Sequence, residues 1–377
     1  MRILHLGKYY PPARGGIESH VQVLARAQAA AGHAVEVLCF NHEDVRGAPA
    51  FGRTVARVVT REDTDGPVRV RRLGRALQLA RTDLSPPLLA EVLRGRLEAT
   101  DVVHLHTPNP AMLAACALAR PRRLVVTHHS DIVKQRRLAR IHGPVEEHVY
   151  GRANRVLATS EAYARASEVL GRHRARVSVV PLGIDLSVFE EVEREAETGA
   201  EPLWLFVGRL VYYKGLKVAL EALQGLPGRL VVVGDGPLRQ ELESRAEALG
   251  VAERVAWRRD VSEAELRSLY ARATALWLPS VARSEAFGLV QVEAMASGCP
   301  VLNTDIPGSG VPWVSLDGAS GRTVPVDDAA AFRAAARELL EPDVRTRLGE
   351  GARARARALF GAETMARATL AAYAEAC

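Results

Sequence analysis

Short apolar runs alternate with amphipathic segments along almost the whole chain. Runs of three to six apolar residues are typical of strands covered on both faces, as in a parallel sheet between layers of helices. In the first half they predict strands at residues 3–6, 35–40, 102–105, 124–126, 156–158 and 177–180. In the second half they predict strands at residues 203–207, 230–233, 255–257, 275–278 and 301–303. The pattern indicates an α/β protein with two open parallel sheets.

Local sequence signals divide the chain between the two series of strands. A helix is expected from about residue 18 to 31, ending at Gly32, since glycine readily takes the positive φ of a helix end. Residues 190–201 are acidic and lack apolar periodicity, which is typical of a linker. Residues 328–377 are rich in Ala, Arg and Glu and are expected to be helical.

The composition supports two soluble domains. The chain has 377 residues, enough for two buried cores, and its apolar runs are far shorter than a membrane span. The start of the chain resembles a first strand rather than a signal peptide, because His5 and Lys8 interrupt it. The four cysteines are scattered without metal-binding spacing. We therefore expect a cytoplasmic protein in a reducing compartment.

Charge is distributed unevenly along the chain. Residues 1–180 carry 28 basic and 16 acidic side chains, whereas residues 181–377 carry 22 and 28. The basic excess is densest at residues 53–96 and 134–140. It indicates either peripheral contact with an anionic membrane or an arginine-rich solvated face. A nucleic-acid partner is not expected, because no zinc finger or RNA-binding signature accompanies the basic residues.

Three glycine-rich segments follow predicted strands, where open α/β sheets bind ligands. The first is Gly15-Gly16, which precedes a helix and is compatible with either a phosphate loop or a tight turn. In the second, Gly208 is followed by Arg209 and Lys214, two cations that could converge on a diphosphate or simply face solvent. The third begins at Gly234 and lacks the last glycine of G-x-G-x-x-G, which argues against a dehydrogenase-type dinucleotide site.

The most informative segment contains two glutamates. Glu285 is expected in a loop, and Glu293 about two turns inside a helix that begins near Phe287. Free amides at that helix start would favour a phosphate, and the carboxylates could accept hydrogen bonds from sugar hydroxyls. Taken alone, the same pattern also fits a capping glutamate and a solvent-facing one.

Together these segments resemble the retaining glycosyltransferases of family 4, which have the GT-B fold. The residues from Glu285 to Glu293 match the E-x7-E signature of that family. Four other pieces match in the same order: Gly15-Gly16-Ile17-Glu18, Pro181-Leu182-Gly183-Ile184-Asp185, Gly208-Arg209-Leu210 with Lys214-Gly215, and Gly234-Asp235-Gly236-Pro237. The resemblance implies two Rossmann-like domains facing across a cleft. Its expected domains are an acceptor-binding domain (1–185), a linker (186–200), a nucleotide-sugar-binding domain (201–360) and a helix returning to the first domain (361–377).

The resemblance also implies roles for individual residues. Arg209 and Lys214 would neutralise the leaving diphosphate, Glu285 would bind the transferred sugar, and Glu293 would bind the ribose. The remaining donor-binding positions that it implies are Gly15, Gly16, Gly208, Gly234, Phe287, Gly288, Leu289 and Val290.

In the first domain, the histidine of the family motif aligns with His129, which would contact the sugar near the reacting carbon. His128 is the alternative alignment, and a purely structural histidine is a further alternative. His106 and Asp131 are weaker candidates on the acceptor side.

The implied chemistry requires neither a metal cofactor nor a protein nucleophile. Cations and a helix N-terminus would stabilise the leaving diphosphate, and the acceptor would attack on the face that the phosphate leaves. A glycosidase pair of acid and nucleophile is an alternative for the two glutamates, but it leaves Arg209 and Lys214 unexplained. Asp63-Thr64-Asp65 superficially matches a metal-binding D-x-D motif, but we expect it in a solvated polar loop.

A finer resemblance concerns the substrates. The segments His129–Val133, Arg283–Gly288 and Pro307–Val314 look like those of bacterial mannosyl- and rhamnosyltransferases of O-antigen and exopolysaccharide assembly. This predicts transfer of a hexose, first of all mannose from GDP-mannose, to a lipid-linked glycan at the inner face of the membrane. The alternatives are a soluble small-molecule acceptor, a nucleotide-sugar epimerase or phosphorylase, and a non-catalytic glycan-binding protein.

Overall fold

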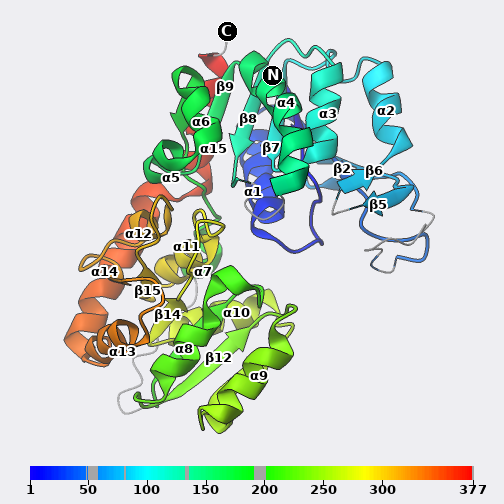
Figure 1. The fold of residues 1–377 in the computed structure, drawn as a ribbon. Coiled ribbons are helices and arrows are strands. Elements are labelled where there is room, and N and C mark those ends of the chain that lie inside the picture. Colours follow the sequence, from blue (N-terminus) through cyan, green and yellow to red (C-terminus); the bar gives the residue numbers. More distant parts are fainter. Residues whose placement is uncertain (48, 50–57, 80–81, 132–135, 191–200, 376–377) are drawn as a thin grey trace. The chain divides into compact units, whose positions relative to one another are not determined.

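The computed structural model describes residues 1–47, 49, 58–79, 82–131, 136–190 and 201–375. It divides into two compact units, residues 1–183 with 362–377, and residues 184–361. Figure 1 shows the helices and strands of both units. Each unit is built around a sheet of parallel strands between layers of helices, as the alternating pattern predicts.

The N-terminal unit contains an eight-stranded sheet in the order β10-β9-β8-β7-β1-β2-β4-β3. All its neighbouring strands are parallel except β3 and β4. The strands are β1 Arg2–Leu6, β2 Ala34–Phe40, β3 Arg61–Asp65, β4 Val68–Leu73, β7 Val102–Thr107, β8 Leu124–His128, β9 Arg155–Ala158 and β10 Val177–Val179. A separate antiparallel pair consists of β5 Leu77–Leu79 and β6 Thr82–Leu84. The helices are α1 Gly16–Ala30, α2 Pro86–Leu93, α3 Pro110–Leu118, α4 Arg136–Arg152, α5 Glu161–Ala166, α6 Glu168–Arg172 and α15 Ala362–Ala374.

The C-terminal unit contains a six-stranded parallel sheet in the order β13-β12-β11-β14-β15-β16. The strands are β11 Leu203–Val207, β12 Arg229–Val233, β13 Val255–Arg258, β14 Ala275–Leu278, β15 Val301–Thr304 and β16 Gly321–Val324. The helices are α7 Ser187–Glu190, α8 Leu216–Leu223, α9 Arg239–Ala248, α10 Glu263–Arg272, α11 Leu289–Ala296, α12 Val311–Val314, α13 Ala329–Glu338 and α14 Pro342–Leu359. A 3₁₀ turn, η2, spans Tyr212–Lys214.

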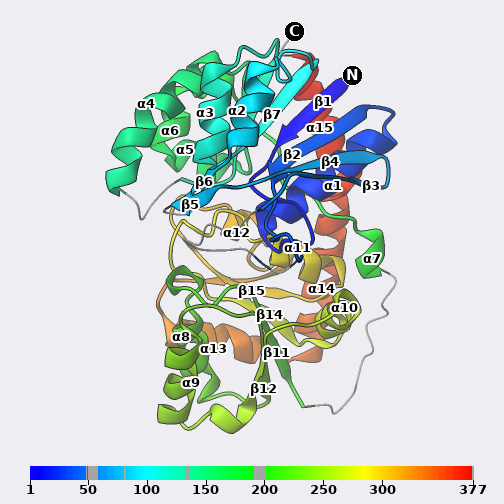
Figure 2. The same ribbon diagram turned by 90° about the vertical axis from the view of Figure 1, so that its right-hand side faces the viewer.

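The last helix completes the first unit although it ends the chain. α15 packs against α1, and Figure 2 shows the two helices side by side. Met365 and Tyr373 are fully buried in the core of the N-terminal unit with Val21 and Leu24 of α1. The end of the chain is thus part of the N-terminal unit, with side chains in reach of its sheet.

Several elements were not expected from the apolar pattern. β3, β4, β5, β6 and β16 are too short or too polar to stand out, although β4 alternates Val68 and Val70 with arginines. In the expected linker, residues 187–190 form α7, whereas residues 191–200 lie outside the described part of the chain. None of the helices in the described ranges has the length and hydropathy needed to cross a membrane.

Candidate functional site

The candidate donor site lies at the carboxyl ends of β11, β12 and β14. The strand order changes direction between β11 and β14, and open α/β sheets bind ligands at such switch points. Gly208 follows β11 and Gly234 follows β12, where Gly234 has a φ of 135°. A Cβ on Gly234 would lie 2.1 Å from the carbonyl oxygen of Gly208. Only glycine lets these two loops approach so closely.

A buried ion pair joins the loops after β11 and β14. Lys214 Nζ lies 2.5 Å from Glu285 Oε2, and both side chains are about 10% exposed. A Cβ on Gly208 would lie 3.2 Å from Lys214 Nζ, so the ammonium group lies over the glycine backbone. A Cβ on Gly215, whose φ is 64°, would lie 1.8 Å from the carbonyl oxygen of Pro279. Glycine at this position therefore lets the turn pack against the loop after β14.

The ion pair leaves polar atoms available for a ligand. Glu285 Oε2 accepts from Lys214 and, at 3.3 Å, from the Ser280 hydroxyl, whereas Oε1 forms no hydrogen bond or ion pair with the described residues. An ammonium group has three protons, so Lys214 retains donors beyond the one directed at Glu285. The side chain of Arg209 is exposed, and within the described ranges it forms no ion pair. The ion pair thus presents an ammonium group and a carboxylate oxygen next to each other, with Arg209 on the same loop as Lys214.

The helix after this loop begins later than expected. α11 starts at Leu289, and Gly288 precedes it in the left-handed conformation with a φ of 73°. The buried Phe287 therefore precedes the helix, and its carbonyl oxygen accepts from the Gln291 side chain at 2.9 Å. The first-turn amides, including those of Leu289 and Val290, have no acceptor within the helix. They can therefore bind an anion at the end of β14.

Glu293 lies about one turn inside α11 rather than two, because the helix starts at Leu289. Its Oε2 accepts a hydrogen bond from the Tyr270 hydroxyl at 2.7 Å. Burial raises the pKa of Glu293 to about 7, against the smaller lowering effect of that hydrogen bond. The other oxygen, Oε1, has no partner among the described side chains. Glu293 is thus held by Tyr270 while one oxygen stays available.

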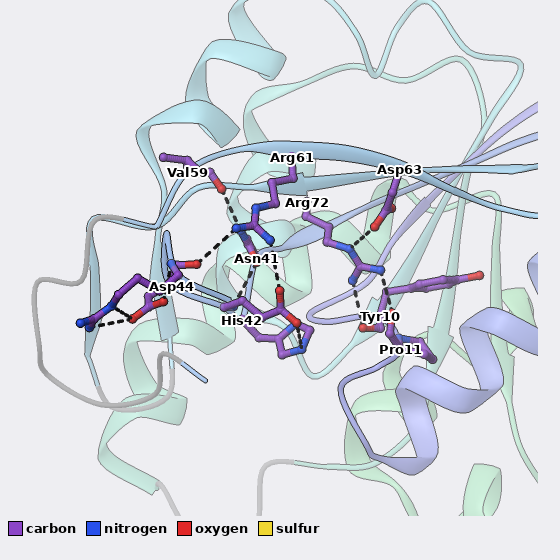
Figure 3. A network of polar contacts seen from close by, with 11 residues as sticks. Tyr10, Pro11, Asn41, His42, Asp44, Val59, Arg61, Asp63 and Arg72 are labelled. Carbon is purple, nitrogen blue, oxygen red and sulfur yellow. Dashed lines mark hydrogen bonds and ion pairs between the residues drawn. The ribbon is translucent and has the colours of Figure 1, made fainter. Parts of the chain in front are cut away.

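In the N-terminal unit, an arginine fixes the loop that leads to Gly15 and Gly16. Arg72 donates to the carbonyl oxygens of Tyr10 at 3.1 Å and Pro11 at 2.7 Å, and to Asp63 at 2.9 Å. Figure 3 shows these contacts together. Because both carbonyls belong to one short loop, Arg72 determines the path of the chain into α1.

The Asp63-Thr64-Asp65 motif is not in a loop, so that part of the expectation is wrong, although Asp63 and Thr64 are exposed to solvent as expected. It forms β3, which pairs with β4 because the alternating valines of β4 present a buried face. Asp63 binds Arg72, and Asp65 accepts from Tyr10 at 2.7 Å and from Gln22 at 3.0 Å. These aspartates support the loop rather than present two free carboxylates.

Gly15 is the N-cap of α1, with Gly16 as its first residue. The carboxylate of Glu18 lies against Gly15, since a Cβ there would be 2.2 Å from Glu18 Oε2. Glu18 is also the acidic residue of the first turn of α1, where a carboxylate is favourable. An anion that approaches Gly16 therefore meets a helix end that is already partly neutralised.

His129 and His106 lie in a cluster of buried histidines. The cluster comprises His5, His20, His104, His106 and His129, all at most 6% exposed. Burial lowers the pKa of His5 to about 4 and that of His20 to about 3, and it lowers the pKa values of the other three well below the usual value. All five are therefore neutral at pH 7.

The histidine cluster also contains groups that could hold a metal ion. The ring nitrogens of His5, His104 and His106 lie within 4.8 Å of one another, and so do those of His20, His106 and His129. Neutral imidazoles are good ligands for zinc. Four of the five rings are, however, hydrogen-bonded to one another or to neighbouring side chains, which is sufficient to account for their burial.

His128 faces a different set of partners from His129. Its Nδ1 lies 2.7 Å from the Tyr150 hydroxyl, and its Nε2 lies 3.0 Å from Asp131. Asp131 also accepts from Ser167 at 2.7 Å. Both ring nitrogens of His128 are thus used within the protein, whereas Nδ1 of His129 has no partner among the described residues. Of the two, His129 is the better placed to bind a ligand.

The sequence drew attention to only part of this site. His5, His20 and Gln28 were not expected in it, although His5 lies in the first strand and His20 in the helix after the glycine loop. Tyr373 was missed because it follows the other members by more than 240 residues. The available signal was the alternation of His104 and His106, which places both on one face of β7.

Comparison with known proteins connects both units to one enzyme class. The family model "Glycosyltransferase Family 4" matches residues 14–188, and the model "Glycosyl transferases group 1" matches residues 188–355. Among curated proteins, the D-rhamnosyltransferase WbpZ of Pseudomonas aeruginosa is 34% identical, with 96% of this chain and 93% of that protein covered. The O-antigen chain mannosyltransferase C of Escherichia coli is 31% identical, with 97% and 96% covered.

Solved structures with the same fold cover nearly the whole chain. The sucrose-phosphate synthase from Thermosynechococcus elongatus superimposes with a TM-score of 0.79 at 23% identity, covering 99% of this chain and 98% of that one. The Anabaena protein HepE, solved with UDP and glucose, gives a TM-score of 0.72 at 19% identity, with 98% of each chain covered. At these identities the superpositions define the fold alone, and they agree with the expected GT-B architecture.

Proposed function

Because the chain belongs to the family 4 glycosyltransferases, we propose that it transfers a hexose from a nucleoside diphosphate sugar to a glycan acceptor. The donor proposed first is GDP-mannose, and the acceptor proposed is a lipid-linked glycan. The names of two relatives, a D-rhamnosyltransferase and an O-antigen chain mannosyltransferase, support an acceptor of the polysaccharide-assembly type. The same names favour mannose or a related sugar.

The observation that carries the proposal is the buried pair of Lys214 and Glu285 at the switch point of the C-terminal sheet. A leaving diphosphate gains negative charge as the glycosyl bond breaks, while the sugar gains positive charge. Lys214, the exposed Arg209 and the first amides of α11 supply positive charge for the diphosphate. Glu285 supplies a carboxylate oxygen for a hydroxyl of the sugar.

The other expected roles fit the same scheme. Glu293 would accept hydrogen bonds from the ribose through its available oxygen, while Tyr270 holds the other oxygen in place. Gly208 and Gly234 keep the backbone open where the diphosphate would approach. In the N-terminal unit, Gly16 would face the pyrophosphate and His129 would bind the transferred sugar.

We further propose that transfer retains the anomeric configuration and needs no metal ion. The bond between the anomeric carbon and the phosphate oxygen breaks, and the acceptor oxygen bonds to the same face of that carbon. The acceptor proton passes to the departing phosphate oxygen, so the step needs no protein nucleophile. Lys214, Arg209 and the first amides of α11 provide the positive charge that a metal ion would otherwise supply to the leaving diphosphate.

Peripheral contact with an anionic membrane at the cytoplasmic face is part of the proposal. Its support is the net basic character of residues 1–180. Many described arginines of the first basic segment are paired with acids: Arg61, Arg71, Arg72, Arg75, Arg94 and Arg96. The second segment, Lys134–Arg140, lies outside the residues whose side chains are described. Any contact would therefore rely on the unpaired part of the basic excess.

Ligand-induced stabilisation tests the donor assignment. GDP-, UDP-, dTDP- and ADP-sugars are compared in a thermal-shift assay with EDTA, using the native chain, Lys214→Ala and Glu293→Ala. A ligand at a hundred times its dissociation constant adds about 2.7 kcal/mol to the stability of the native state. We expect stabilisation by GDP-mannose that both variants lose. Stabilisation that requires a divalent metal would refute the metal-independent site, and no response to any nucleotide sugar would refute the proposed donor class.

A further inference from the structure

A continuous chain of buried hydrogen bonds ends at His129. Gln28 Oε1 lies 2.7 Å from His5 Nε2, His5 Nδ1 lies 3.0 Å from His106 Nε2, and His106 Nδ1 lies 3.2 Å from His129 Nε2. Gln28 lies on α1, and the histidines lie on β1, on β7 and directly after β8. Gln28, His5 and His106 are at most 1% exposed, whereas His129 keeps 6% of its surface exposed. His129 is thus the end of the chain nearest to solvent.

The chain determines which nitrogen of each ring carries the proton. A neutral imidazole has one N–H donor and one bare nitrogen, and burial keeps these rings neutral by lowering their pKa values. Gln28 Oε1 accepts only, so His5 is protonated at Nε2 and accepts at Nδ1. His106 then donates from Nε2 and accepts at Nδ1. His129 must donate from Nε2, which leaves its Nδ1 without a proton.

The orientation of the Gln28 amide sets this order of donors and acceptors, and that amide is hydrogen-bonded to Tyr373 of α15. Gln28 Nε2 donates to the Tyr373 hydroxyl at 3.1 Å, and the same hydroxyl lies 2.6 Å from His104 Nδ1. His104 Nε2 lies 2.7 Å from the Thr127 hydroxyl. A reversed amide would reverse every donor and acceptor between Gln28 and His129. The direction of the chain is therefore a property of a single buried amide.

We propose that Gln28 is a positioning residue that sets His129 to present an unprotonated Nδ1, a hydrogen-bond acceptor, to a sugar hydroxyl. This inference rests on the proposed function, in which His129 binds the transferred sugar. It specifies the chemistry of the ligand: the group that faces His129 must be a donor, as a hydroxyl is. An ether or a carbonyl oxygen at that position would meet a bare nitrogen and would be rejected.

The protonation of His129 can be observed directly in the native chain. Imidazole ¹⁵N chemical shifts distinguish protonated from bare nitrogens, so histidine-¹⁵N-labelled protein is measured at pH 7. The His129 signals are identified by their loss in His129→Phe. We expect a proton on Nε2 and none on Nδ1. A proton on Nδ1, a charged ring, or signals that change when a chelator is added would overturn the inference.

Two substitutions at one buried position test the role of Gln28. The Gln28→Glu variant keeps an oxygen that accepts the hydrogen bond from His5. The Gln28→Met variant has a side chain of similar length, but its sulfur accepts a hydrogen bond far more weakly. We expect Gln28→Met to give a mixture of His129 tautomers and a loss of about tenfold in kcat/KM with the sugar donor, and Gln28→Glu to keep the native tautomer and most of the activity. Equal losses in both variants, with an unchanged His129 tautomer, would overturn the role of Gln28.

The failure of this inference is distinguishable from failure of the proposed function. Affinity for the nucleoside diphosphate alone is expected to be the same in the native chain and in Gln28→Met, because that ligand lacks the transferred hexose that would meet His129. If the native chain transfers sugar but its His129 carries the proton on Nδ1, only the inference fails. If the native chain neither binds nor transfers any nucleotide sugar, the proposed function fails. Should both Gln28 variants fold poorly, the spectrum of the native chain alone still decides the tautomer.

Discussion

Removal of the charge on Glu285 is the perturbation that tests the donor site most directly. Glu285→Gln retains the shape of the side chain but leaves Lys214 without its counter-charge. Both side chains are about 10% exposed and the charged atoms are 2.5 Å apart, so solvent can replace little of the lost interaction. Removal of one partner from a buried ion pair costs about 3–5 kcal/mol. We expect a loss of that size in the free energy of unfolding.

A matched control comes from an exposed ion pair in the same unit. Arg229 lies 2.8 Å from Glu201, but these side chains are 58% and 50% exposed. Glu201→Gln should therefore cost less than about 1 kcal/mol. The assay is urea unfolding followed by tryptophan fluorescence, since Trp204 and Trp277 are fully buried in the core of the C-terminal unit. Because the chain has two units, the comparison uses transition midpoints at equal slope.

The ligand adds a second, independent readout. If Lys214 binds the diphosphate, a nucleoside diphosphate supplies the charge that Glu285→Gln removes, so it should stabilise this variant more than it stabilises the native chain. The double variant with Lys214→Met should recover part of the lost stability, because no unpaired charge remains. A loss no larger than that of Glu201→Gln would refute a buried pair. Equal stabilisation by the diphosphate in both proteins would refute its contact with Lys214.

Two further predictions concern the same sheet edge. The pKa of Glu293 is about 7 in the folded chain and near 4.5 in the unfolded chain, so the native state binds the proton more tightly and the free energy of unfolding falls as pH rises from about 4.5 through 7. Glu293→Gln should remove this fall, which is at most about 3 kcal/mol between pH 5 and pH 8 in urea unfolding. An unchanged pH dependence in the variant would contradict the burial of the Glu293 carboxyl group. Gly234→Ala should destabilise the chain by more than about 2 kcal/mol, because the added Cβ would overlap the carbonyl oxygen of Gly208. Gly250 also has a positive φ but has open space around it, so Gly250→Ala should cost about 1 kcal/mol in the same assay. Equal costs would contradict the close approach of the Gly208 and Gly234 backbones.

The sequence was most informative where one segment carries both structure and chemistry. The short apolar runs predicted both parallel sheets, because near-continuous apolar strands are typical of sheets that are buried on both faces. The positions of Gly208, Gly234 and Glu285 could be predicted for a related reason, since each follows an apolar strand at the ligand-binding end of the sheet. The start of α11 was placed too early, because Gly288 adopts a left-handed conformation that composition does not specify. That difference places Glu293 about one turn inside α11 instead of about two.

The polar strands were harder to predict because their partners are distant in sequence. Asp63-Thr64-Asp65 has the composition of a loop, and it becomes a strand only because β4 offers it a neighbour and Arg72 offers Asp63 a charge. In the same way, the basic residues near β4 suggested a charged surface, whereas the structure pairs many of them with acids. The density of arginines in a segment therefore overstates the number of unpaired cations on the surface wherever those arginines have acidic neighbours in space.

The histidine cluster shows how chemistry can depend on contacts that no local pattern contains. His5, His106 and His129 come from three segments, and they meet because β1, β7 and β8 are neighbours whose carboxyl ends lie at one edge of the sheet. The topology brings the rings together, but it does not fix which nitrogen carries the proton. That is decided by the Gln28 amide, which turns its oxygen toward His5 and donates from its nitrogen to the Tyr373 hydroxyl. The C-terminal helix, which contributes Tyr373, would then influence the protonation of a residue 244 positions earlier, and Tyr373→Phe should weaken that preference without removing any group that touches the sugar.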